Sequence, residues 1–469
     1  MSQSNAPETN SNAFLVQAPI SQLLLRFSLP CVLSLLVSAL YNIVDQIFIG
    51  QGVGYLGNAA TTVVYPFTVI ALAVALLVGD GCAALLSLSL GRGDGETARR
   101  SIGNGIVLTA IAAVVLTAVG FLLEDQILTL FGVTEACYAY ARDYMTVILM
   151  GIPFYMFTSA LNGAIRADGD PKYAMVSTVL GAVINLILDP VAIFLLDMGV
   201  TGAAVATILG QIASCVLSVL YFRHPRSFWL TRECFRLKGS TARTICALGV
   251  SSLIIQMAIV IVIAVANNMI VLYGPASEYG ADIPLSAIGI VMKVFAIVIA
   301  FAVGIAVGGQ PIVGYNYGAG RYDRVLETLK GILLANAVVG LIATALFELC
   351  PMAIISLFGS ESDLYNQYAV LCFRVYLAGI LLCCIQKASS IFLQSMGKPL
   401  QSTLLSLARD VIFFVPGLVL LAPRYGVVAC CGPPPSRTFW PSWPPPSSSS
   451  GRSAPSKLCA KPKKEVVFV

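Results

Sequence analysis

The chain has 469 residues, of which 58% are hydrophobic and only 11% are charged, whereas an ordinary soluble domain is about 25% charged. Twenty-eight basic and 23 acidic side chains cannot coat a soluble chain of this length, so most of it must face lipid. The net charge of +5 gives no support to nucleic-acid binding, and the single histidine, His224, leaves little for a zinc enzyme or a Ser-His-Asp hydrolase, so no enzymatic activity is expected.

Residues 1–20 are polar and predict a cytoplasmic tail. They lack the basic and then apolar order of a cleavable signal peptide, so the first apolar segment should remain in the protein as a helix. The thirteen cysteines form no C-x-x-C pair, and most lie in apolar runs, so they are interpreted as small buried hydrophobes. No cofactor and no structural metal are expected.

The apolar runs predict an all-α polytopic membrane protein. A spanning helix needs about 20 apolar residues, and runs of that length are too long for barrel strands. We predict eleven such helices, at residues 25–49, 61–90, 103–123, 141–165, 173–196, 201–222, 246–273, 285–313, 329–352, 368–394 and 401–422.

Lysine and arginine fall in alternate loops. The loops after the second, fourth, sixth, eighth and tenth spans carry these residues, and the loops after the first, third, fifth, seventh and ninth carry none. Because basic loops stay on the cytoplasmic side, the N-terminus is predicted to be cytoplasmic. Residues 223–244 then form a basic cytoplasmic linker at mid-chain.

The two halves of the chain repeat. Four landmarks recur at an offset of 227 or 228 residues, namely Gly91 with Gly318, Phe131-Gly132 with Phe358-Gly359, Gly199-Val200 with Gly426-Val427, and Gly169-Asp170-Pro171 with Gly397-Lys398-Pro399. Six spans per repeat keep both copies in the same orientation, related by an axis along the membrane normal. We therefore predict two lobes, residues 21–222 and 245–428, that face one central cleft.

The repeat also predicts a twelfth helix, but residues 429–469 are rich in proline and serine, and prolines disrupt a membrane helix. One interpretation is a disordered tail. The other is a shifted reading frame, because with free choice of synonymous codons a shift of two nucleotides turns residues 429–450 into an apolar run. Our hypothesis is that the chain is frameshifted from about residue 429 and that its parent has twelve helices.

Six strings in this order resemble the MATE family (multidrug and toxic compound extrusion), especially its bacterial drug-efflux branch. They are LYNIVDQIFIG, SLGRGD, GAIRADGDPKY, NLILDP, GVTGAAVAT and GQPIVGYNYGAGR, and the resemblance covers about residues 21–428. It implies a monomeric secondary antiporter in the bacterial plasma membrane, surrounded by lipid. Such an antiporter exports small organic cations in exchange for H⁺ or Na⁺ by alternating access.

Asp45, in the outer half of the first span, is the first candidate for the coupling site. Ionisable groups inside a span are costly and mark functional sites, and Tyr41 and Asn42 lie one turn back on the same face. Asp45 could instead only bond neighbouring backbone near the helix end. By resemblance, MATE proteins use an aspartate at this position.

Asn185 and Asp189 are four residues apart and therefore share one face of the fifth span, where Pro190 loosens the helix and frees a carbonyl. Thr207 reaches a similar depth in the sixth span. By resemblance these side chains, with Asp45 and less securely Asn162, form the site for H⁺, or for Na⁺ held by Asp45 and Asp189. The polar partners could equally be packing groups between helices.

Other side chains within the spans are candidates for the cleft or for a kink, namely Pro30, Asp80, Gln256, Lys293 and Arg409. Sodium-coupled relatives place acids in the seventh and tenth spans, whereas residues 246–273 and 368–394 contain none. Ile412 and Pro416 stand at the repeat positions of Asn185 and Asp189. Ion coupling is therefore expected in the first lobe, which favours protons.

Three alternatives remain open from the sequence. A lipid-linked-sugar flippase of the same superfamily would need a strongly cationic cleft, whereas this chain places acids there. A passive channel differs from a carrier only in transport assays. A chain without its twelfth helix could also be a non-functional product.

Overall fold

A computed structural model describes residues 14–407 with gaps at 134, 274–281, 359–362 and 378, and beyond them only Pro416 and Leu420. The chain separates into one unit of residues 1–433 and a second of residues 434–469. Arg409, most of the predicted eleventh span and the region of the predicted twelfth helix and tail lie outside the described residues.

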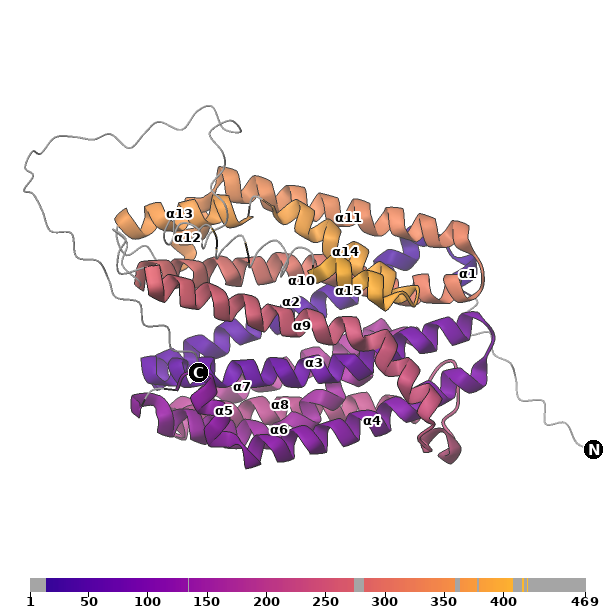
Figure 1. Ribbon diagram of the computed structural model, residues 1–469, viewed down its shortest axis with the longest axis horizontal. Helices are drawn as coiled ribbons and strands as arrows, with labels where there is room; N and C mark the ends of the chain where they lie inside the picture. The colour runs from indigo at the N-terminus through magenta and orange to yellow at the C-terminus, as the bar shows by residue number, and fades with distance from the viewer. Residues whose placement is uncertain are drawn as a thin grey trace, which may run out of the picture. The chain divides into compact units, whose positions relative to one another are not determined.

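The first lobe contains six long helices and two short ones (Figure 1). They are α1 (Phe14–Gln17), α2 (Ile20–Gly52), α3 (Tyr55–Gly91), α4 (Gly95–Leu122), α5 (Glu124–Leu130), α6 (Glu135–Ala167), α7 (Pro171–Pro190), which continues as the π-helical turn η1 (Val191–Leu195), and α8 (Gly199–Tyr221).

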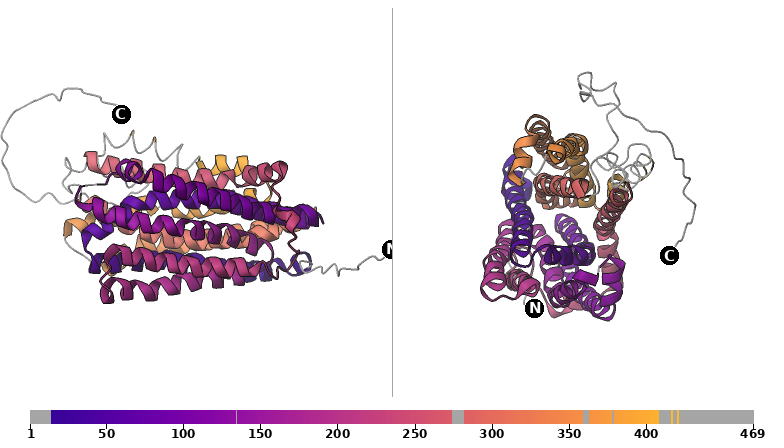
Figure 2. Two further views of the ribbon diagram at one scale, coloured as in Figure 1. Left: turned by 90° about the horizontal axis from the view of Figure 1, so that it is seen from below. Right: turned by 90° about the vertical axis from the view of Figure 1, so that its left-hand side faces the viewer.

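The linker carries a short 3-10 turn, η2 (Arg232–Phe235), and leads into the second lobe. The helices described there are α9 (Gly239–Tyr273), α10 (Asp282–Gly318), α11 (Tyr322–Leu349), α12 (Pro351–Phe358), α13 (Asp363–Leu377), α14 (Ile380–Ser395) and α15 (Pro399–Leu407). The end-on view in Figure 2 separates the first-lobe helices, in indigo to magenta, from most second-lobe helices, in salmon to orange.

The described helices agree with the first ten predicted spans. Nine are long and apolar enough to cross a membrane, and residues 365–375 with 380–395, bent by 46° at the break between them, pass the same test when taken together as one span. Large apolar side chains such as Val114, Ile187 and Leu334 remain exposed on the outer surface, at 67%, 59% and 69%. Only lipid can cover such a surface without cost, so the protein is a multi-pass membrane protein.

The turns of the repeat have the same backbone geometry in both lobes. Gly93 and Gly320, which are 227 residues apart, have φ of +75° and +71°, and Gly169 and Gly397 have φ of +95° and +75°. Left-handed backbone of this kind ends a helix and strongly favours glycine. In the first lobe Asp94 follows such a turn and caps α4 by accepting a hydrogen bond from the Thr97 amide at 3.0 Å, which lowers the pKa of the Asp94 carboxyl.

The two lobes meet at the end of the bundle that carries the basic loops, which we call the basic end. A Cβ atom on Gly81 or Gly249 would overlap the carbonyl oxygen of Ile245 or Leu77 across the α3–α9 contact. Gly91 and Gly318 allow the same approach between α3 and α10. All interlobe contacts of this kind in the described part of the chain lie in the half of the bundle toward the basic end.

Helix α2 belongs to both lobes, and Figure 1 shows it crossing obliquely between them. Its first half packs on α10, where the Ser28 hydroxyl donates to the Ile305 carbonyl at 3.1 Å and Gly304 faces Val32. Its second half packs on α7. Pro30 is buried in the half against α10 and cannot bond the carbonyl one turn before it, which places the predicted kink point at the lobe boundary.

The linker is fixed to the first lobe by two buried polar side chains. The Asn104 amide donates to the carbonyls of Cys234 and Arg236, at 3.0 and 3.2 Å, and its oxygen accepts from the Lys238 amide at 2.9 Å. Asp168 accepts from the Tyr221 hydroxyl and from the backbone amides of residues 226 and 227. The basic linker is therefore anchored to the first lobe by hydrogen bonds.

Replacement of Asn104 by leucine is expected to release this linker. It leaves three backbone groups without partners, at about 1–3 kcal/mol each, so trypsin should cut after Arg232 or Arg236 at least tenfold faster. The matched control is Asn336→Leu, since the amide of this equally buried asparagine bonds only its own helix, at Ile332. Equal cleavage rates in the two variants would contradict the anchoring role of Asn104.

Candidate functional site

Two carboxyl groups, an amide and a hydroxyl meet between α2, α7 and α8. The side chains of Asp45 and Asp189 lie within hydrogen-bonding reach of each other. The Asn185 amide donates to Asp189 Oδ1 at 3.1 Å and to Thr207 Oγ1 at 3.2 Å. We call these four residues the acid-pair site.

Local geometry explains why these side chains converge. Asn185 and Asp189 are one turn apart on α7, and Pro190 ends the regular helix, which continues as the π-helical turn η1. Helices α7 and α8 can approach because Gly181 and Gly210 face each other, and a Cβ on either would overlap the backbone of the other helix. A larger residue at Gly181 would therefore separate Asn185 from Thr207.

The acid-pair site has more acceptor atoms than donors. Asp189 and Asn185 are buried, at 0% and 3% exposure, and Asp45 is partly buried. In the part of the chain that the structure describes, three buried oxygens have no hydrogen-bond partner, namely Asp45 Oδ1, Asn185 Oδ1 and Asp189 Oδ2. Buried acceptors without donors are costly. Carboxylate and amide oxygens are the ligands of a proton or a hard cation, so the arrangement fits either ion.

Tyrosines surround the two carboxyl groups. Tyr41 on α2 and Tyr144 on α6 interact electrostatically with both Asp45 and Asp189, and Tyr65 on α3 and Tyr155 on α6 interact with Tyr41. Only Tyr41 was predicted from the sequence. Tyr65 lies on the helix that follows α2, and Tyr144 and Tyr155 lie on a helix distant in the chain. No spacing in the sequence relates these three tyrosines to Asp45.

Two predicted members of the site have other partners. The Asn42 amide donates to the Ser38 carbonyl of its own helix at 2.6 Å and lies next to Tyr41. Asn162 donates to Thr178 Oγ1 and accepts from Ser177 Oγ, both at 3.0 Å. Thr178 is two turns of α7, about 10 Å, from Asn185 toward the basic end. The structure therefore places Asn162 in a separate polar cluster.

The remaining cleft candidates also lie away from the acid pair. Asp80 Oδ2 accepts a hydrogen bond from Ser252 of α9 at 2.6 Å, and Gln256 lies one turn further along α9. Lys293, on α10, is partly buried and has no hydrogen bond or ion pair to any residue that the structure describes. Within the described ranges, no group of three or more His, Cys, Asp and Glu residues could hold a metal ion.

Comparison with known proteins gives matches along most of the chain. The sequence profile of the MatE family matches residues 30–191 and 253–419. The multidrug export protein MepA of Staphylococcus aureus is 23% identical over 426 residues, which cover 88% of this chain and 90% of MepA. MepA of Staphylococcus haemolyticus is 22% identical over 419 residues, with the same coverage.

Solved structures of similar fold cover nearly the whole described region. The MATE multidrug transporter DinF-BH is 32% identical and superposes with a TM-score of 0.80 over 91% of this chain and 92% of its own. A MATE protein in complex with MaL6 is 22% identical, with a TM-score of 0.82 over 89% and 93% of the two chains. A superfamily transporter from Pyrococcus furiosus is 22% identical, with a TM-score of 0.81 over 92% and 93%. The chain therefore belongs to the MatE family, whose members are multi-pass membrane transporters and not enzymes.

Proposed function

We propose that the protein is a secondary antiporter that exports small organic cations in exchange for a coupling ion. The resemblance to multidrug export proteins supports the class of cargo. The protein is proposed to act as a monomer in a bacterial plasma membrane, with its N-terminus in the cytoplasm. The basic end is then cytoplasmic, and the close interlobe contacts there correspond to a carrier that is closed toward the cytoplasm.

The acid-pair site is the observation that supports this proposal. Two of its three unpartnered oxygens belong to carboxyl groups, whose negative charge either a proton or a cation can neutralise. Competition between the cargo and the coupling ion for that charge produces exchange, without a covalent step. Tyr41 and Tyr144 beside the carboxyl groups add aromatic faces, which attract organic cations.

We propose the proton as the coupling ion. Asp45 and Asp189 lie within hydrogen-bonding reach of each other, so the two carboxyl groups could share one proton. The acids that sodium-coupled relatives carry in the seventh and tenth spans are absent from residues 246–273 and 368–394. Protonation would then release the cargo outward, and deprotonation toward the cytoplasm would reset the site.

Transport by purified protein in vesicles tests the proposed ion. A pH gradient alone is expected to drive movement of ethidium against its own gradient, and a sodium gradient alone is expected to drive none. Ethidium movement that is driven only by the sodium gradient would support an antiport coupled to Na⁺ in place of H⁺. Equilibration of ethidium without either gradient would instead indicate a passive channel.

The basis for a lipid-linked-sugar flippase is weaker. Such a carrier must neutralise a pyrophosphate, which needs several basic groups in the binding region. The acid-pair site presents two carboxyl groups instead. Retained flipping of an anionic lipid with no ethidium exchange would favour the flippase over the cation antiporter.

We also propose that the coding sequence changes frame near residue 429, since the repeat calls for a helix there. Resequencing the codons for Val427 to Gly432 tests this. A one- or two-base error would restore a twelfth helix. A confirmed frame would make this chain a remnant of such a transporter, and the vesicle assay above would show no exchange.

A further inference from the structure

Asp80 is an acid of the first lobe that begins a chain of hydrogen bonds into the second lobe. Its Oδ2 accepts from the Ser252 hydroxyl of α9 at 2.6 Å, and Ser252 in turn accepts from the Gln394 amide of α14 at 2.8 Å. Both partners are buried, at 7% and 3% exposure, whereas Asp80 keeps partial accessibility inside the bundle. This chain of hydrogen bonds crosses the lobe boundary.

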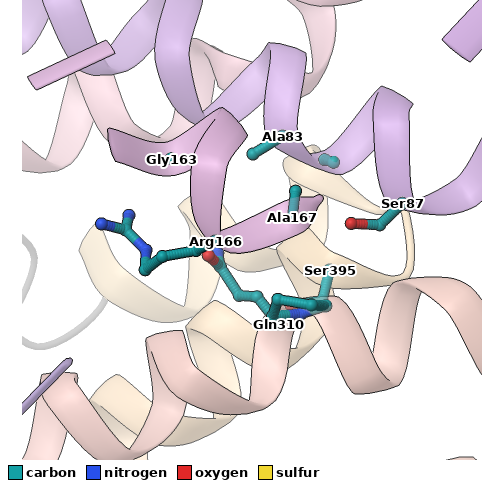
Figure 3. A pocket seen from close by; sticks show the side chains of 9 residues that line it. Ala83, Ser87, Gly163, Arg166, Ala167, Gln310 and Ser395 are labelled. Carbon is teal, nitrogen blue, oxygen red and sulfur yellow. The ribbon is translucent and has the colours of Figure 1, made fainter. Parts of the chain in front are cut away.

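One positive charge lies near this chain. Arg166 of α6 interacts electrostatically with Asp80 but forms no ion pair with it within 4 Å. Arg166 lines a small pocket between the lobes together with Ser87, Gln310 and Ser395, and Figure 3 shows its guanidinium pointing away from Ser87 and Ser395. The Arg166 guanidinium has no hydrogen bond or ion pair within the described part of the chain. Among the residues that line the pocket, Arg166 is the charged one.

Asp80 and the acid-pair site lie at different depths. Asp80 is eleven residues, about 16 Å, from the end of α3 at Gly91, at the basic end. Asp45 is twenty-five residues, about 37 Å, from the start of α2 at Ile20, at the same end. The two acids are thus about 20 Å apart along the bundle, and Asp80 is the one nearer the cytoplasm in the proposed orientation.

Separation of the lobes at the basic end would remove Ser252, with Gln394 behind it, from Asp80. The contacts of Gly81, the residue after Asp80, and of Gly249, about one turn before Ser252, would part in the same movement. The carboxylate would then face the opened cleft with only Arg166 on its own lobe. A carboxylate that loses its hydrogen bonds in a poorly solvated cleft binds a cation strongly.

We propose that Asp80 is a second binding site for the cargo, open only toward the cytoplasm, where it captures an organic cation before the acid-pair site does. When the lobes close, Ser252, which Gln394 holds, returns to Asp80 and replaces the cation, which moves on to Asp45 and Asp189. Closure of the basic end and transfer of the cargo are then one event. This inference rests on the proposed antiport.

Uptake of ethidium by inside-out vesicles, which expose the cytoplasmic face, tests the second site. Asp80→Asn keeps an acceptor for Ser252 but removes the charge, and it should raise the KM for ethidium at least tenfold. Ser252→Ala frees the carboxylate and should lower the KM threefold or more. A purely structural role for Asp80 would shift the two values in the same direction, because both changes weaken one hydrogen bond.

The outcomes separate this inference from the proposed function. Opposite shifts in KM support the second site. An unchanged KM in Asp80→Asn, or KM shifts in the same direction in both variants, overturns the second site. The proposed antiport is judged separately, by ethidium uptake with the unaltered protein. If Asp80→Asn does not fold, Ser252→Ala is compared with Gln394→Leu, which removes the donor to Ser252 and keeps the bond between Ser252 and Asp80. A KM that Ser252→Ala does not lower, or that both variants lower equally, overturns the inference.

Discussion

Asp45→Asn is expected to abolish ion-coupled export. The substitution preserves the shape of the side chain but removes one of the two carboxyl groups that touch in the acid-pair site. Without this carboxyl group the site cannot exchange a proton for the cargo, and we expect a loss of exchange of about 100-fold, which corresponds to about 2.7 kcal/mol. The measurement is ethidium efflux from vesicles under a pH gradient, per molecule of folded protein.

Asp189→Asn should have the same effect, and the double variant should be no worse than either single one. The two carboxyl groups titrate as one unit, so removing the second adds little once the first is gone. The control is Asp143→Asn, which alters an exposed carboxyl on α6. Full exchange in Asp45→Asn would show that the coupling site lies elsewhere.

Gly249→Leu should prevent the basic end from closing and should stop transport. A Cβ at this position overlaps the carbonyl oxygen of Leu77, which is backbone and cannot rotate away. The carrier would then be held open at the basic end, with export reduced at least tenfold. Ser395 lines the interlobe pocket. When Ser395→Cys is combined with Gly249→Leu, the introduced thiol should react with a thiol reagent faster than in Ser395→Cys alone.

Gly239→Leu is the matched control on the same helix, because no atom lies within 4 Å of a Cβ at that position. It should leave export and cysteine labelling unchanged. Normal export by Gly249→Leu, in properly folded protein, would mean that the observed α3–α9 contact is not required in the cycle.

The members of the acid-pair site could be grouped from the sequence because they obey short-range rules. Asn185 and Asp189 share a helical face through their spacing of four residues, and Thr207 follows on the next helix. The family resemblance adds Asp45 to this group. In the structure the carboxyl groups of Asp45 and Asp189 lie within hydrogen-bonding reach of each other. Tyr144 and Asn162 show the limit, because the rotation and depth of α6 relative to α7 depend on packing that no local pattern records.

Hydropathy predicted the spans but not their ends or bends. The first span was expected at 25–49, whereas α2 covers Ile20–Gly52, since a helix continues into the headgroup region as long as its backbone is satisfied. The run at 368–394 gave no sign that the helix breaks before Ile380. A break changes the backbone direction and leaves the apolar composition intact, so composition cannot reveal it.

The matching glycine turns at Gly93 and Gly320, and at Gly169 and Gly397, indicate an origin by gene duplication and fusion. A copy with an even number of spans returns to its starting side, so a second copy could be appended without inverting either one. The descendants then diverged unequally, because the first half holds Asn185 and Asp189 where the second has Ile412 and Pro416. The ancestral protein would have paired two identical halves, each with its own ion site, and in the proposed antiport the fused chain keeps ion binding in one half and uses the other as its moving counterpart.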